Sequence, residues 1–250
     1  MILKLLTYNI RYGGVGRESL IGEVIRAAAP DIVFFQEATV PDIVTRIAQQ
    51  TGMRFHVSRR NLSVACCSRV KIRHHEWFYP RGSKHPYLEI YPQGVHGRIF
   101  GLHLRAMFSN WGERRRKQEI QFLLNSIKEH QHGFHAVVGD FNTLAPNELL
   151  DVKKMPRWIR TMIWLSGRNL QRETIQLMLD RGYVDGFRSL NAEEKGYTLP
   201  TYDPQLRLDY VFVPANELSR LLKCEVITQS PVTEASDHFP LMCHIDFPDE

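Results

Sequence analysis

Residues 137–142 form an apolar run that ends in Gly-Asp-Phe-Asn, and this pattern strongly constrains the fold. The two valines at 137–138 predict a buried strand. A carboxylate at the strand end, Asp140, is suited to act as a base or a metal ligand, and the amide of Asn142 has the same strand parity and is expected on the same face. The alternative is a simple turn. Polar clusters of the same kind at four other strand ends favour a catalytic or metal-binding site over a simple turn.

The order of the predicted elements favours one domain. Strands at 2–8 and 32–35 are each followed by a helix, at about 20–28 and 41–50. Short strand-like runs follow at 53–58, 61–68, 70–79, 86–91 and 98–104, before a helix at 113–128. Further strands are predicted at 183–187, 207–213, 221–227 and 239–247. A chain of 250 residues is long enough for one large domain, which we expect to span 1–250.

The strand ends carry the candidate site residues. Asn9 follows the first strand and Glu37 the second, while His103 lies near the end of the strand at 98–104. Asp209 opens an apolar strand, where a charge is costly unless it meets a partner. Ser-Asp-His at 236–238 precedes the last strand, so Asp237 and His238 offer the other half of an acid–base site.

Two basic segments leave alternatives open. The loop from Arg105 to Trp111 could stack a base or grip a headgroup, or it could simply pack Met107 and Phe108 on the core. The excursion at about 151–182 carries seven basic groups with an apolar helical face, and it could contact a membrane or a long substrate, or pack on the domain. Its basic residues are Lys153, Lys154, Arg157, Arg160, Arg168, Arg172 and Arg181, and its apolar face is Trp158, Met162 and Leu165. The histidines at 130, 132 and 135 indicate a turn rather than a zinc site.

The composition indicates the kind of partner and the cellular compartment. The formal charge of +5 and the pI near 9.1 fit a polyanionic partner, either nucleic acid or an anionic lipid surface. The four cysteines form neither a zinc pattern nor a disulfide framework, so we expect buried reduced thiols. The first residues lack the pattern of a signal peptide, so we expect none, and no apolar run reaches the roughly 18 residues that would span a membrane. A cytoplasmic protein is expected.

Six segments in register resemble the endonuclease/exonuclease/phosphatase superfamily. They are Thr7-Tyr-Asn-Ile10, Gln36-Glu37, Leu102-His-Leu104, Gly139-Asp-Phe-Asn142, Arg207-Leu-Asp-Tyr-Val-Phe212 and Ser236-Asp-His238. The resemblance implies a four-layered α/β/β/α sandwich of two packed sheets flanked by helices. It also implies hydrolysis of phosphoesters with a divalent metal.

The resemblance also implies residue roles. Glu37 matches the principal metal ligand, Asn9 its neighbour and Asp237 an accessory metal-site carboxylate. Asp140 matches the residue that positions or deprotonates water, and Asn142 a phosphate-orienting amide. Asp209 matches the partner of His238, which would contact the scissile phosphate. His103 lies where members carry His or Tyr, and we add Arg11, Arg105 and Trp111 as substrate-binding candidates.

Departures from the family pattern leave the substrate open. Apurinic-type members carry Asp where this chain has Arg11, and deoxyribonuclease-type members carry Arg soon after the Glu, where this chain has Ala38 and Thr39. The oxygen ligands suit Mg²⁺ or Mn²⁺. We expect a phosphodiesterase or nuclease acting on DNA or RNA by in-line attack of water. The alternatives are a phospholipid or inositol-phosphate phosphoesterase and, less favoured, a basic nucleic-acid-binding module without activity.

Overall fold

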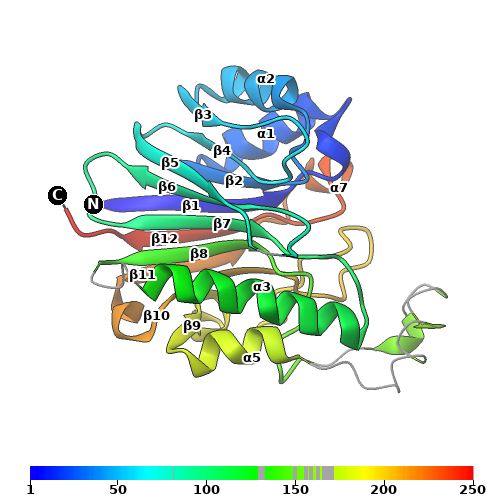
Figure 1. Cartoon of the computed structure of the whole chain (residues 1–250). Helices are drawn as coiled ribbons and strands as arrows, with labels where there is room; N and C mark the ends of the chain where they lie inside the picture. Colours follow the sequence, from blue (N-terminus) through cyan, green and yellow to red (C-terminus); the bar gives the residue numbers. More distant parts are fainter. Residues whose placement is uncertain are drawn as a thin grey trace.

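Two six-stranded sheets pack face to face in the computed structural model (Figure 1). The structure describes residues 1–80, 82–128, 133–148, 151–154, 157, 160–161, 164 and 172–249. The first sheet has the order β11 (Leu221–Val226), β12 (Leu241–Asp246), β1 (Ile2–Asn9), β2 (Ile32–Gln36), β4 (Ala65–Ser68), β3 (Phe55–Val57). The second has the order β5 (Ile72–Phe78), β6 (Tyr87–Pro92), β7 (Arg98–His103), β8 (His135–Asp140), β10 (Asp209–Pro214), β9 (Tyr183–Asp185).

Helices cover the outer face of each sheet. The first sheet is covered by α1 (Glu18–Ala28), α2 (Pro41–Thr51) and α7 (Val232–Ala235), and the second by α3 (Asn110–Lys128) and α5 (Glu173–Asp180). The short α6 (Gly186–Leu190) follows β9, and 3-10 turns occupy Tyr12–Gly14, Val152–Lys154 and Ala215–Arg220. The expected four-layered sandwich is therefore confirmed.

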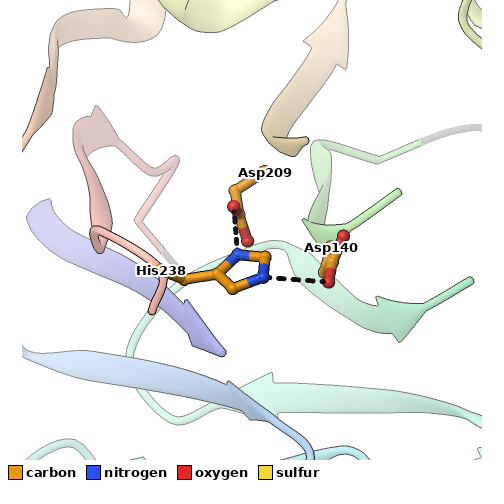
Figure 2. A group of neighbouring side chains, drawn as sticks. All are labelled: Asp140, Asp209 and His238. Atoms are coloured by element: carbon orange, nitrogen blue, oxygen red, sulfur yellow. Dashed lines mark hydrogen bonds and ion pairs between the residues drawn. The ribbon is translucent and has the colours of Figure 1, made fainter. Parts of the chain in front are cut away.

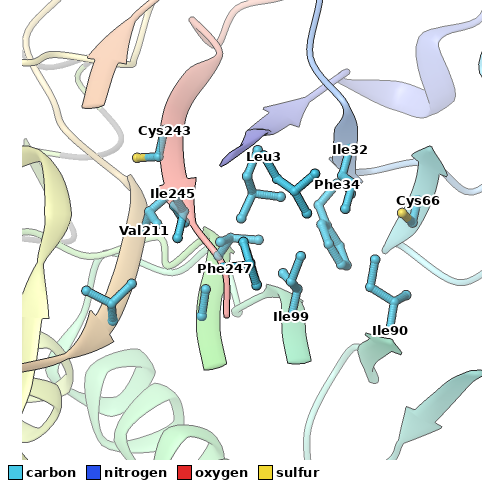
Figure 3. Packing of buried hydrophobic residues seen from close by; sticks show 14 of the residues in the cluster. Leu3, Ile32, Phe34, Cys66, Ile90, Ile99, Val211, Cys243, Ile245 and Phe247 are labelled. Carbon is cyan, nitrogen blue, oxygen red and sulfur yellow. The ribbon is translucent and has the colours of Figure 1, made fainter. Parts of the chain in front are cut away.

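Strand β1 shows why so many strands are apolar along their whole length. Leu3 and Leu5 belong to the core between the sheets, whereas Leu6 and Tyr8 belong to the core under α1 and α2. Successive side chains of a strand point to opposite faces, so a strand covered on both sides needs apolar residues on both faces. Figure 3 shows the core between the sheets, where Phe34 lies with side chains from both layers.

Strand register brings the polar strand ends to one edge of the sandwich. β1 and β2 are parallel with Asn9 opposite Gln36, and β7 and β8 are parallel with His103 opposite Asp140. β10 runs antiparallel to β8 with Asp209 opposite Asp140. His103, Asp140 and Asp209 therefore form one row across three neighbouring strands.

Gly139 is required by the close approach of β7. A Cβ added there would lie 2.1 Å from the carbonyl oxygen of Leu102, and the residue has a φ of +144°. We therefore expect Gly139→Ala to lower the free energy of unfolding by at least about 2 kcal/mol, which is a fall in Tm of roughly 4–8 °C in thermal unfolding. At Gly133 an added Cβ meets nothing within 4 Å. Gly133→Ala is the matched control, and an equal loss of stability in both variants would contradict this explanation.

Several strand predictions were too long, among them 53–58 and 61–68, and two of them have a local reason. The run predicted at 183–187 pairs only over Tyr183–Asp185, because the carboxylate of Asp185 accepts a hydrogen bond from the backbone N–H of Arg188 at 3.2 Å and begins α6. The run predicted from 207 pairs from Asp209 onward. The Arg207 side chain is fully buried, where its guanidinium lies 2.5 Å from Glu148 and 2.6 Å from Asp185.

The prediction of reduced cysteines was wrong for one pair. Cys224 and Cys243 lie opposite each other on β11 and β12 and form a disulfide. Their 19-residue separation hid the pairing, because sequence does not reveal which strands are neighbours. Cys66 and Cys67 are free and buried, as predicted.

Part of the predicted basic excursion belongs to the domain core. Ile175 and Met178 of α5 pack under the second sheet, and Arg172 donates a hydrogen bond to the carbonyl of Pro146 at 2.9 Å. Trp158, Met162, Leu165 and Arg168 lie outside the described residues, as do His130 and His132. Among the helices of the described ranges, none is long and apolar enough to cross a membrane.

Candidate active site

A histidine held between two carboxylates lies at the centre of the polar edge. The Nδ1 atom of His238 is 2.8 Å from Oδ2 of Asp209, and its Nε2 atom is 3.9 Å from Oδ2 of Asp140 (Figure 2). Asp140 and Asp209 come from paired strands, and His238 comes from the segment before β12 in the other sheet. All three side chains are buried. The dyad expected between Asp209 and His238 is therefore present as a direct contact.

The charges of this trio depend on one another. Burial lowers the pKa of His238, but the carboxylates of Asp209, Asp140 and Asp237 together raise it to about 10, so the imidazole is cationic at neutral pH. Burial and the neighbouring charge of Asp209 raise the pKa of Asp140 to about 7. The site thus concentrates acidic groups in a buried place, where a cation stabilises them.

The first sheet contributes Asn9 and Glu37 to the same edge. The Nδ2 atom of Asn9 donates to Asp140 at 3.0 Å and lies 3.5 Å from Oε1 of Glu37. The other carboxylate oxygen of Glu37 accepts from the backbone N–H of Tyr12 at 2.6 Å. Glu37 has a φ of +58°, which is uncommon for a residue with a long side chain. Backbone strain of this kind gathers at functional sites.

Ser63 and His85 join the site without any signal in the sequence. The Ser63 hydroxyl accepts from the backbone N–H of Glu37 at 2.9 Å and lies 2.6 Å from Nδ1 of His103. The hydroxyl proton is therefore free to point at Nδ1, which leaves the proton of a neutral His103 on Nε2, 3.7 Å from Asp140. Burial and the ring of His85, stacked at 4.8 Å, hold the pKa of His103 well below its usual value.

Asp237 lies beside the trio and contacts the loop that follows β1. Its Oδ2 atom is 3.3 Å from Nε of Arg11, and its Oδ1 atom is 3.5 Å from the hydroxyl of Ser236. That hydroxyl donates to the carbonyl of Asn9 at 2.7 Å. Ser236 therefore fixes the loop of Asp237 and His238 to the end of β1.

Asn142, Arg105 and Trp111 lie at the same edge with different neighbours. β8 ends at Asp140, so the strand alternation does not extend to Asn142, and the prediction that relied on it was wrong at that residue. Asn142 has a φ of +50°; its N–H donates to Asp140 at 2.9 Å and its amide donates to the carbonyl of Leu104 at 3.0 Å. The guanidinium groups of Arg105 and Arg115 lie over the Trp111 ring, 5.5 and 5.3 Å from its centroid.

The carboxylate oxygens at this edge fit a divalent cation, whereas the protonated imidazole of His238 does not ligate a metal. Within the described part of the chain, one carboxylate oxygen from each of Asp140 and Asp209 and one nitrogen of His238 lie within 4.8 Å of one another. Oδ1 of Asp209 is buried without a hydrogen-bond partner among the described residues. This group differs from the predicted ligands Asn9, Glu37 and Asp237, but it adjoins them through the contact of Asn9 with Asp140.

Glu119 of α3 gives a prediction about how stability depends on pH. Burial raises its pKa to about 7 from 4.5, although Arg105 and Arg116 lower it. Above pH 4.5 the unfolded chain loses this proton while the folded chain keeps it. The contribution of Glu119 to stability is therefore complete below pH 4.5 and is lost as pH rises through 7, about 3 kcal/mol in all.

We expect Glu119→Gln to remove this dependence, so that its stability relative to the wild type rises between pH 5 and pH 8 in denaturant titrations. Glu193→Gln, on an exposed loop, is the control. A constant difference between the Glu119 variant and the wild type across that range would contradict the assignment.

Comparison with known proteins identifies the class. The sequence profile of the Endonuclease/Exonuclease/phosphatase family matches residues 6–238, and the chain belongs to this family. It is accordingly an enzyme of the hydrolase class, and the predicted resemblance is confirmed. No curated protein matches the chain in a sequence search.

Solved structures share the fold at low identity. A 3' phosphatase, NExo, from Neisseria bound to a product DNA hairpin is 19% identical with a TM-score of 0.76, covering 98% of this chain and 100% of that chain. An AP endonuclease from Archaeoglobus fulgidus is 18% identical with a TM-score of 0.77, covering 98% and 99%. TDP2 from D. rerio complexed with single strand DNA product is 17% identical with a TM-score of 0.68, covering 98% and 99%.

Proposed function

We propose that the chain hydrolyses phosphodiester bonds of DNA or RNA with the help of a divalent cation. The observation that carries the proposal is the position of His238 between Asp209 and Asp140, at the edge where Asn9 and Glu37 also lie. A phosphodiester needs an activated water and stabilisation of the negative charge that develops in the transition state. The groups for both tasks meet at this edge.

Each residue has a proposed task in this reaction. The cationic imidazole of His238, held by Asp209, donates a hydrogen bond to a phosphoryl oxygen. Asp140, oriented by Asn9 and by the N–H of Asn142, aligns the attacking water for in-line displacement. His103 presents a neutral N–H toward Asp140 and helps to fix that carboxylate. Asn142 remains our candidate for an amide contact to the phosphate.

The cation site is proposed from the oxygen donors. Glu37, Asn9 and Asp237 would hold Mg²⁺ or Mn²⁺, and the acidic group of Asp140 and Asp209 adjoins them. When bound, such an ion supplies charge neutralisation and Lewis-acid polarisation at the phosphoryl group. Arg11, Arg105 and Trp111 are proposed to contact substrate around this site.

The preference for nucleic acid rests on charge and on the similar structures. The chain carries a net charge of +5, and two of the structures described above were solved with DNA products. The alternative substrates are a phospholipid such as sphingomyelin or an inositol phosphate.

The test is hydrolysis of single-stranded DNA, duplex DNA, RNA, inositol phosphates and sphingomyelin vesicles, each with Mg²⁺ and with Mn²⁺. We expect turnover of a nucleic acid, with binding that weakens as salt rises, at a log–log slope of about −0.7 to −0.9 per phosphate contacted. Turnover of lipid or inositol phosphate with no hydrolysis of any nucleic acid would contradict the proposal.

A further inference from the structure

The loop after β1 has an unusual backbone. Residues 11–14 have four consecutive positive φ values, +48°, +48°, +72° and +68°, and the first two belong to Arg11 and Tyr12 rather than to glycine. A positive φ brings the Cβ of an L-residue too close to its own backbone, so glycine or asparagine is preferred there. Tyr12 therefore occupies a position that disfavours tyrosine.

The Tyr12 side chain adds little stability in return for this cost. Tyr12 is 75% exposed, so its ring gains little from burial. Its described contact is with the Arg11 guanidinium, which lies 5.1 Å from the ring centroid and is itself bound to Asp237. An exposed cation–π pair of this kind is weak. A strained, solvent-exposed aromatic residue is better explained by a ligand than by stability.

Tyr12 is fixed to the candidate active site through its backbone. Its N–H donates to Oε2 of Glu37, and the N–H of Gly13 donates to the carbonyl oxygen of Glu37 at 2.9 Å. The N–H of Arg11 donates to Oδ1 of Asn9 at 3.0 Å. The strained turn thus holds the Tyr12 backbone directly against two proposed metal ligands.

A second exposed tyrosine is attached to the same site from another loop. Tyr202 is 79% exposed and follows Thr201, whose N–H donates to the carbonyl of Asp237 at 2.9 Å. The Thr201 hydroxyl donates to the carbonyl of Ser236, also at 2.9 Å. Arg11, which precedes Tyr12, pairs with the Asp237 carboxylate, and Thr201, which precedes Tyr202, donates a hydrogen bond to the Asp237 carbonyl.

We propose that Tyr12 and Tyr202 are specificity-determining residues that stack on unpaired bases next to the scissile phosphodiester, an inference that rests on the proposed function. Exposed aromatic rings beside a phosphate-binding site are the usual means of holding single-stranded nucleic acid, because every base has a π-face. Trp111 serves this purpose less readily, since Arg105 and Arg115 already lie over its ring. The preferred substrate is a strand whose bases are unpaired at the cut.

The test compares two single strands of equal length, one of thymidine nucleotides and one of tetrahydrofuran abasic residues, which keeps the phosphates and lacks the bases. With Mg²⁺ present, the wild-type enzyme should show a kcat/KM roughly 5- to 150-fold higher on the strand with bases. Tyr12→Asn and Tyr202→Ala should each reduce that preference through KM and leave hydrolysis of the abasic strand unchanged. Phe122→Ala, a partly exposed ring on α3, is the control and should change neither value.

Thermal unfolding separates this role from a structural one. Tyr12→Asn should have a Tm equal to or above that of the wild type, because asparagine tolerates a positive φ. Equal losses on both strands, unchanged kinetics or a lowered Tm for Tyr12→Asn would overturn the inference while leaving the proposed function in place. If the wild-type enzyme hydrolyses neither strand but hydrolyses sphingomyelin vesicles, the proposed function fails and the base-stacking role fails with it.

Discussion

Asp209→Ala and His238→Ala should each lower kcat/KM for phosphodiester hydrolysis by about 10²–10⁴-fold. The double variant should lose little more than either single variant. The two side chains are 2.8 Å apart, and the Asp209 carboxylate helps to raise the pKa of His238 to about 10. Without Asp209 the imidazole loses both its orientation and much of its positive charge. Without His238 the carboxylate has no partner through which to act.

Steady-state kinetics of the two single variants and the double variant measure this coupling. Asp209→Asn keeps the shape of the side chain and removes its charge, so it should fall close to the alanine variant in activity while unfolding at nearly the wild-type temperature. His75→Ala, at an exposed position on β5, is the control for loss of a histidine. Losses that multiply in the double variant would show that the two residues act independently.

Glu37→Gln should raise the concentration of Mg²⁺ needed for half-maximal activity by at least about 10-fold. The substitution replaces a negatively charged oxygen donor by a neutral amide while preserving the acceptor for the Tyr12 N–H at one oxygen. Activity titrated with Mg²⁺ and Mn²⁺ is the measurement. Glu18→Gln on α1, which removes an exposed pair with Arg46, is the matched control. An unchanged metal titration for Glu37→Gln would remove this residue from the cation site.

The layers of the fold and the polar strand ends could be predicted from local patterns. Strand β2 is apolar at every position up to Gln36, which indicates a strand covered on both faces, and Glu37 follows at its end. The same pattern precedes Asp140. Because parallel neighbours end at the same edge, Gln36 at the end of β2 lies opposite Asn9 of β1, and Asp140 lies opposite His103 of β7.

Long-range pairing and backbone conformation could not be predicted in this way. Ser63 reaches His103 only because the loop before β4 folds over the end of β2. The disulfide depends on β11 and β12 being neighbours. At Asn142 a positive φ replaces the strand alternation on which the prediction relied. Each of these features arises from contacts between distant segments, which local periodicity does not record.

The most direct test of the central claim is hydrolysis of a labelled single-stranded oligonucleotide by the purified enzyme after treatment with excess EDTA, followed by addition of Mg²⁺ or Mn²⁺. Four carboxylates surround one site, those of Asp140, Asp209, Glu37 and Asp237. If they hold a cation that the reaction needs, the chelated enzyme is inactive and either ion restores turnover. Full turnover in excess EDTA would contradict the account.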